Sequence, residues 1–114
     1  EDITLFGEGE ERRDHVLIDD VAEIIHLVVR YRSKGILTVA SGEVVSFREL
    51  AEMVVAQFDV PVAIKGSPRK GPMPHNGYRP FDVSATGAVF PEFRYTLPAE
   101  GINRVHAQMT ETGW

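Results

Sequence analysis

The stretch that decides how this sequence is interpreted is Gly7-Glu8-Gly9-Glu10-Glu11-Arg12-Arg13-Asp14-His15-Val16-Leu17-Ile18-Asp19-Asp20-Val21-Ala22. Its glycines predict a turn that closes the β-prone run Ile3–Phe6. The apolar run Val16–Ile18 predicts a second short strand. Asp20, with Glu23 three residues later, predicts a capped helix start, and apolar residues at helical spacing extend this helix from about Val21 to Tyr31.

Further strands and helices are expected downstream. The apolar run Ile36–Ala40 predicts a buried strand. The capping box that Ser46 forms with Glu49 predicts a helix that continues to Phe58, and the run Val60–Ile64 predicts another strand.

The segment Gly66–Pro80 is rich in glycine and proline, which predicts a long irregular loop, and a loop of this length in a compact domain is usually functional or disordered. Two more helices are expected beyond it, one after Asp82-Val83-Ser84 through Val89 and one from about Ala99 to Met109. The predicted fold class is therefore α+β, with short strands and three or four helices.

Composition excludes several classes of protein. The 114 residues carry 12 Lys+Arg against 17 Asp+Glu, a net charge of −5, which argues against nucleic-acid binding. No apolar run is long enough to span a membrane. The absence of Cys excludes disulfides and thiolate chemistry and is compatible with a cytoplasmic protein. There is no initiator Met and no signal peptide, so we expect the sequence to begin inside a longer protein.

The usual catalytic and cofactor motifs are missing. The turn Gly7-Glu8-Gly9 lacks the third glycine of a dinucleotide fingerprint, because position 12 is Arg, so no cofactor site is predicted. No serine has a nucleophile-elbow context. The tightest metal-ligand cluster combines Asp14, His15 and the pair Asp19–Asp20, but two Asp before a helix more often act as caps, so no metal site is predicted.

Three arginines beside glycine or proline are candidates for binding phosphate: Arg13, Arg69 and Arg79. The planar guanidinium matches two phosphate oxygens at once, so three loop arginines could converge on a diphosphate. The alternative is that they are solvated surface arginines.

The quoted stretch closely resembles G-x-G-x-x-x-R-D-F-I-H-V-D-D-V-A of the extended short-chain dehydrogenases/reductases, the family of nucleotide-sugar epimerases and dehydratases. Four later segments resemble family motifs in the family order. They are 35–42 ("G-x-x-N-x-G-S-G"), 45–51 ("V-S-x-x-E-L-A"), 79–84 ("R-x-x-D-x-S") and 97–102 ("L-x-E-G-I"). The resemblance covers nearly the whole chain, but only about the C-terminal third of the family's length.

This resemblance implies that residues 1–114 are the C-terminal substrate-binding region of an NAD(P)-dependent epimerase/dehydratase. The N-terminal Rossmann domain, with its G-x-x-G-x-x-G and Y-x-x-x-K motifs, is absent. This part is therefore expected to be inactive alone and to bind no cofactor. NAD or NADP would be bound by the parent enzyme. The nucleotide-phosphate arginine of the family corresponds to Arg13, and either Arg69 or Arg79 corresponds to a second one. The segment Gly66–Pro80 would act as a lid over the nucleotide-sugar.

The sequence departs from the family pattern at several positions. His15, a candidate substrate contact, replaces the usual Phe or Tyr, Leu17 replaces His, and Thr86 replaces Lys. The usual "L-G-W-x-P" is replaced by 89–93. These departures leave the sugar and the nucleotide open. The run Ile36–Ala40 would normally join the Rossmann sheet, and its exposed edge predicts a homo-oligomer or strand-swapped assembly.

Two other classes remain open as alternatives. The first is a stand-alone, non-enzymatic binding or interaction module that uses this half of the fold. The second is a metal-dependent hydrolase.

Overall fold

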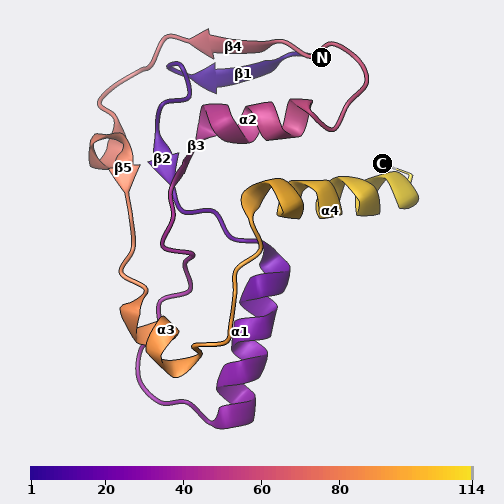
Figure 1. Ribbon diagram of the computed structural model, residues 1–114. Coiled ribbons are helices and arrows are strands. Elements are labelled where there is room, and N and C mark those ends of the chain that lie inside the picture. Colours follow the sequence, from indigo (N-terminus) through magenta and orange to yellow (C-terminus); the bar gives the residue numbers. More distant parts are fainter. Residues whose placement is uncertain (114) are drawn as a thin grey trace.

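The structure is a computed structural model that describes residues 1–113 (Figure 1). The described residues form four α-helices, one 3-10 helix and short strands in two small sheets, so the predicted α+β class is confirmed. The elements are β1 (Ile3–Phe6), β2 (Arg12–Arg13), α1 (Ile18–Tyr31), β3 (Val45–Ser46), α2 (Phe47–Val55), β4 (Ile64–Ser67), η1 (Pro74–Gly77), β5 (Tyr78–Arg79), α3 (Ser84–Val89) and α4 (Pro98–Glu111). No described helix is long and apolar enough to cross a membrane.

One end of the molecule is a parallel pair of strands, β1 and β4, covered by α2 (Figure 1). The register runs from Ile3 opposite Ile64 to Phe6 opposite Ser67. Two adjacent parallel strands must be joined by a long crossover segment of the chain. Here the crossover contains β2, α1, β3 and α2, so this end joins the start of the chain to a strand about 60 residues later.

The centre of the molecule is a three-stranded sheet in the order β3-β2-β5. β2 is antiparallel to β3 and parallel to β5, and each strand contributes two residues. Two backbone hydrogen bonds continue the β2–β3 contact beyond the strands, from Phe47 N to Glu11 O (3.1 Å) and from Arg48 N to Gly9 O (2.9 Å). The sheet therefore brings together residues from three well separated parts of the sequence.

The helices with strong local signals form where the sequence predicts them, although α2 ends at Val55 instead of Phe58. At α2, Ser46 Oγ accepts from Glu49 N (3.1 Å), while Glu49 Oε2 accepts from Ser46 N (2.7 Å). This reciprocal capping box satisfies two backbone N–H groups that would otherwise lack partners. The helices predicted near α3 and α4 are confirmed as well, although α4 extends from Pro98 to Glu111.

The predicted start of the first helix is wrong. α1 begins at Ile18, its N-cap is Leu17 without a side-chain hydrogen bond, and the residues Val16–Ile18 form no strand. Asp20 does not cap the helix, because it is the third helical residue and is 7% exposed. Its carboxylate instead accepts hydrogen bonds from Thr96, which ties α1 to the segment before α4.

The two later strand predictions fail for a different reason. The segment Ile36–Ala40 forms no strand, because no other described strand lies beside it to pair with, and Ile36 is 95% exposed. The strand predicted at Val60–Ile64 begins only at Ile64 and continues to Ser67.

The segment Gly66–Pro80 is also more ordered than predicted, since it contains the end of β4, η1 and β5. The loss of the Ile36–Ala40 strand removes the basis for predicting a strand-swapped assembly.

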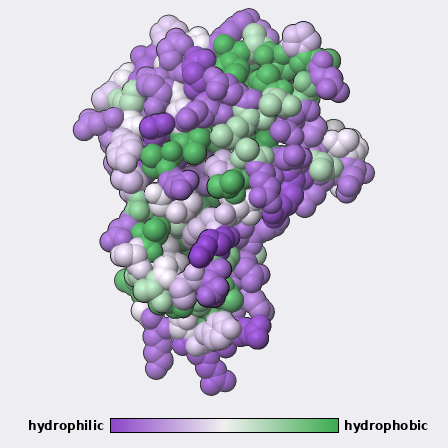
Figure 2. Space-filling view, in the orientation of Figure 1, coloured by the Kyte–Doolittle hydropathy of each residue, from purple (hydrophilic) through white to green (hydrophobic). Residues whose placement is uncertain are grey.

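The molecule is flat and open. Its principal extents are 47 × 40 × 17 Å and its radius of gyration is 16.7 Å, whereas a compact chain of this length has a radius of about 13 Å. The buried apolar residues of the described chain are few: Ile24, Ala40, Ala51 and Phe90. Figure 2 shows apolar side chains at the surface near the β1/β4 end and again near the α1/α3 end. The described residues therefore leave much apolar surface in contact with solvent.

Candidate functional site

Arg13 and Arg79 lie side by side in the central sheet. They are direct partners in the parallel register of β2 and β5. Side chains at paired positions of neighbouring strands project from the same face of a sheet. The structure thus brings two of the three candidate phosphate arginines together, although they are 66 positions apart in the sequence.

Glu11 joins the third candidate, Arg69, to the same place. Its carboxylate pairs with Arg13 Nη2 through Oε1 and with Arg69 Nη1 through Oε2, the latter at 2.8 Å. The side chain of Glu11 is 13% exposed, and those of Arg13 and Arg69 are 21% and 19% exposed. Glu11 was not among the residues predicted from the sequence, and no sequence pattern marks it, because its two partners are set by tertiary contacts.

Arg79 is the most accessible of the three arginines. It is exposed, its guanidinium lies 5.5 Å from the ring centre of Phe81, and its Nη1 lies 2.6 Å from Nε2 of His75. His75 has positive φ inside η1, and the carbonyl of the preceding Pro74 accepts a hydrogen bond from Arg13 Nη2 (3.4 Å). The segment between β4 and β5 therefore contacts both Arg13 and Arg79.

Asp14, which follows Arg13 directly, fixes the neighbouring segment. It accepts hydrogen bonds from Ser41 N and Ser41 Oγ (both 2.9 Å) and from Gly42 N (2.7 Å). Three donors on one carboxylate are a strong local restraint. Of the Asp and His residues that the sequence grouped as possible metal ligands, Asp14 and Asp20 thus face protein donors on different segments. Residues 1–113 contain no group of three or more His, Asp or Glu suited to a metal ion.

His15 follows β2 by two residues and makes an edge-to-face contact with Phe47 at 5.5 Å between ring centres. Its Nε2 is buried and makes no hydrogen bond to the described residues. Burial lowers the pKa of His15, and the negative charge of Asp14 opposes this shift only in part. His15 is therefore favoured as a neutral ring in the wall of two cavities.

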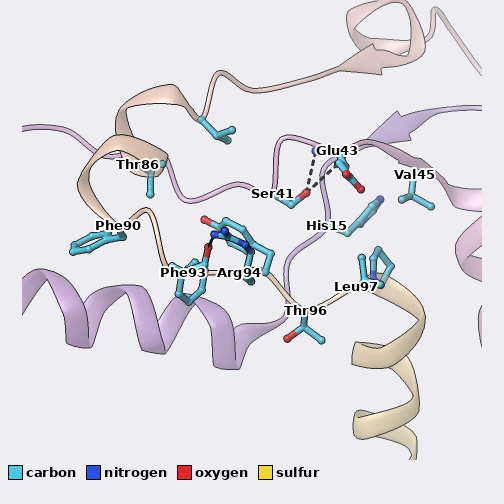
Figure 3. Close-up of a pocket in the computed structure, with 14 residues that line it drawn as sticks. His15, Ser41, Glu43, Val45, Thr86, Phe90, Phe93, Arg94, Thr96 and Leu97 are labelled. Carbon is cyan, nitrogen blue, oxygen red and sulfur yellow. Dashed lines mark hydrogen bonds between the residues drawn. The ribbon is translucent and has the colours of Figure 1, made fainter.

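The first cavity, about 280 Å³, lies between the segment 41–45, α3 and the residues leading to α4 (Figure 3). His15, Ser41 and Glu43 line one side of it, and Phe93 and Arg94 line another. Nη1 of Arg94 donates to the carbonyls of Pro91 and Phe93, which holds the guanidinium against its own backbone segment.

The second cavity, about 440 Å³, lies between α2 and α4 and is lined mainly by apolar side chains. They include Leu50, Val54, Ile102 and Val105. Its mouth is open, and nothing in the described residues indicates a polar ligand there. The arginine group at β2 and β5 lies outside both cavities.

The glycine turn before β2 does not fit a dinucleotide. Gly7 N and Gly9 N already donate to Ser67 O and Phe6 O. A side chain added at Gly9 would meet the backbone nitrogen of Arg48 at 2.9 Å, so the turn is filled by protein on that side. A strand follows it, whereas diphosphate recognition of this kind uses a helix N-terminus. The residues of this turn therefore do not supply a cradle for NAD or NADP.

Comparison with known proteins identifies related sequences and folds. Residues 1–40 match the NAD dependent epimerase/dehydratase family. A search of curated proteins gave no match. The fold is similar to GDP-L-fucose synthetase from Naegleria fowleri bound to NADP, with a TM-score of 0.82 and 17% identity over 97% of this chain and 34% of that chain.

Two further solved structures have the same fold. WbmH from Bordetella bronchiseptica in complex with NAD⁺ has a TM-score of 0.78 and 21% identity, and the match covers 100% of this chain and 37% of that one. UDP-glucose 4-epimerase from Thermotoga maritima with UDP-glucose has a TM-score of 0.71 and 21% identity, and the match covers 98% of this chain and 36% of that one. The chain therefore spans about a third of the length of these proteins. The resemblance noted in the sequence is confirmed: residues 1–40 match the NAD-dependent epimerase/dehydratase family, and nearly the whole chain has the fold of a part of the solved structures named above.

Proposed function

We propose that this chain is the C-terminal, substrate-binding part of an NAD(P)-dependent nucleotide-sugar epimerase or dehydratase, and that it is inactive alone. The observation that carries the proposal is the pairing of Arg13 with Arg79 on adjacent strands. Two guanidinium groups on one face offer the charge and the donors that a diphosphate needs. In this arrangement Arg13 and Arg79 bind the two phosphates of a nucleotide-sugar.

The geometry favours Arg79 over Arg69 as the second phosphate ligand. Arg79 is exposed and beside Arg13, whereas Arg69 is mostly buried and paired with Glu10 and Glu11. His15 is less well placed for direct contact with a phosphate, because its lowered pKa favours the uncharged ring. We expect His15 to contribute packing against Phe47 instead.

The open shape supports a role as one part of a larger enzyme. Ile18, Ile25 and Val29 form an exposed apolar stripe on α1, on a different side from buried Ile24. Ile36 and Val39, in the segment after α1, are exposed as well. Solvent exposure of such side chains is unfavourable by about 25 cal/mol per Å². We infer that a cofactor-binding domain, about twice the size of this chain, packs on this surface, since the similar structures are about three times as long.

In the whole enzyme, NAD or NADP would supply the hydride chemistry. This chain would bind and orient the substrate and hold its phosphate charge, without binding the cofactor itself. Positioning of that kind lowers an activation barrier by at most about 7–11 kcal/mol. Self-association of the enzyme remains an expectation that light scattering can test.

The first experiment is to read the coding frame upstream of Glu1. A G-x-x-G-x-x-G segment and a Y-x-x-x-K pair in the same frame would support the proposal, and a frame that opens just before Glu1 would favour a stand-alone binding module. The complete protein is then titrated with UDP-glucose and with a GDP-sugar. Arg13→Ala and Arg79→Ala should each weaken binding by about 10-fold or more.

Arg104→Ala is the matched control, because Arg104 is an exposed arginine on α4 that pairs with Glu100. It should bind with unchanged affinity. Equal affinity of all three variants and the unmutated protein would refute a role of the arginine pair.

A further inference from the structure

Glu11 and Arg69 form a chain of contacts that ends at Arg13. Glu11 lies one residue before β2, and Arg69 lies just after β4, so their ion pair also connects the two sheets. The carboxylate of Glu11 has one oxygen on each arginine. We propose that Glu11 and Arg69 are positioning residues that hold the guanidinium of Arg13 in the orientation needed for phosphate. This inference rests on the proposed function of Arg13.

Arg69 is committed to protein contacts. Nη1 donates to Glu11 Oε2 (2.8 Å), and Nη2 donates to Phe6 O (3.4 Å) and lies 3.8 Å from Glu10 Oε1. Its Nε is buried without a hydrogen bond to the described residues. These contacts engage both terminal nitrogens of Arg69, and in this proposal Arg69 acts on a ligand through Glu11.

Arg13 is held by acceptors on two separate segments. Glu11 and the carbonyl of Pro74 both accept from Nη2, and the carbonyl of Arg12 accepts from Nη1 (3.1 Å). A long side chain without such partners samples many rotamers, and binding then has to restrict them. The Glu11 carboxylate removes much of this freedom before a ligand arrives.

Removal of Glu11 should change the affinity for an anion in the direction opposite to that expected from charge alone. A negative side chain beside an anion site repels the anion, so its removal should strengthen binding if charge alone matters. If Glu11 orients Arg13, its removal weakens binding even though the site becomes more positive. The direction of the change therefore separates the two roles.

The test measures binding of inorganic pyrophosphate by the complete protein, using calorimetry, for Glu11→Ala, Glu11→Gln, Arg69→Met and the double variant Glu11→Ala/Arg69→Met. Each single variant should lose about 10-fold in affinity, with Glu11→Gln losing less because one acceptor oxygen remains. The double variant should lose no more than Glu11→Ala alone, since both residues act through one contact chain. Glu52→Ala, an exposed glutamate on α2, is the control and should bind unchanged.

Several outcomes would overturn the positioning role. They are tighter binding by Glu11→Ala, unchanged binding by Arg69→Met, and a loss from Arg69→Met that is as large in the Glu11→Ala background as in the unmutated protein. The last result would make Arg69 a direct phosphate ligand. Absence of pyrophosphate binding by the unmutated protein would refute the proposed function as well. Circular dichroism checks folding, and if Glu11→Ala does not fold, Glu11→Gln carries the same prediction of weaker binding.

Discussion

Asp20 and Thr96 are joined by two hydrogen bonds across 76 positions of sequence. Thr96 N donates to Asp20 Oδ2 at 2.6 Å, and Thr96 Oγ1 donates to Asp20 Oδ1 at 2.8 Å. The carboxylate is nearly buried, so both of its oxygens depend on Thr96. This contact fixes the first turn of α1 against the segment that leads into α4.

Replacement of Asp20 should therefore be strongly destabilising. Asp20→Ala leaves the Thr96 N–H without its acceptor, and the loss should be about 3 kcal/mol in the free energy of unfolding. Urea denaturation of the complete protein measures it. Asp19→Ala, at the exposed neighbouring position, should cost only about 0.5 kcal/mol through the helix dipole. Equal losses for the two variants would contradict this role of the Thr96 contact.

The three hydrogen bonds to Asp14 predict local protection of the backbone. In Asp14→Ala, the amides of Ser41 and Gly42 lose their acceptor, and their hydrogen exchange should accelerate by about 10-fold or more. Hydrogen exchange followed by mass spectrometry detects the change. Asp59→Ala, at an exposed position, should leave the exchange rates of these two amides unchanged. Unchanged rates in Asp14→Ala would show that the Asp14 contacts do not protect them.

A side chain at Gly9 should be destabilising. Its φ is +74°, and an added Cβ would meet Leu5 Cδ1 at 2.6 Å and Arg48 N at 2.9 Å. Gly35 also has positive φ (+97°) but has open space around it, so Gly35→Ala measures the backbone strain alone. We expect Gly9→Ala to lower the unfolding free energy by about 1–3 kcal/mol more than Gly35→Ala does. Similar values for both would show that the neighbours of Gly9 move aside.

His15 should make stability depend on pH. Burial lowers its pKa in the folded state, so the unfolded state binds a proton more readily, with a pKa of about 6.5. The stabilisation is fully present above that value and is lost as the pH falls through the lowered pKa of the folded state. His15→Phe keeps the aromatic contact with Phe47 and should lose less stability than the unmutated protein between pH 7 and 5. Parallel stability curves for the two proteins would exclude this effect.

The parts of the fold predicted from sequence are those with local causes. The capping box of Ser46 and Glu49 needs only residues three apart, and it forms as predicted. Asp20 shows the opposite case, because a position suited to capping is used for a contact with Thr96 that no local pattern contains. Ile36–Ala40 has the composition of a strand but lacks a partner among the described residues, and a strand requires one.

The candidate site also contains residues that the sequence predicts and one that it does not. The positions of Arg13 and Arg79 near turns and the family resemblance predict them as phosphate ligands, and the sheet register brings them together. Glu11 is not predicted, because a glutamate beside two others in Glu8–Glu11 has no distinguishing spacing. Its two arginine partners come from β2 and from the segment after β4, and only the folded chain reveals them.

The parallel pairing of β1 with β4 also has a consequence during synthesis on the ribosome. Ile3 emerges about 60 residues before its partner Ile64. At about 5–20 residues per second, β1 waits roughly 3–12 s for β4. Throughout that time its backbone donors and acceptors lack their partner strand, so nascent β1 stays an unpaired strand until β4 has been made.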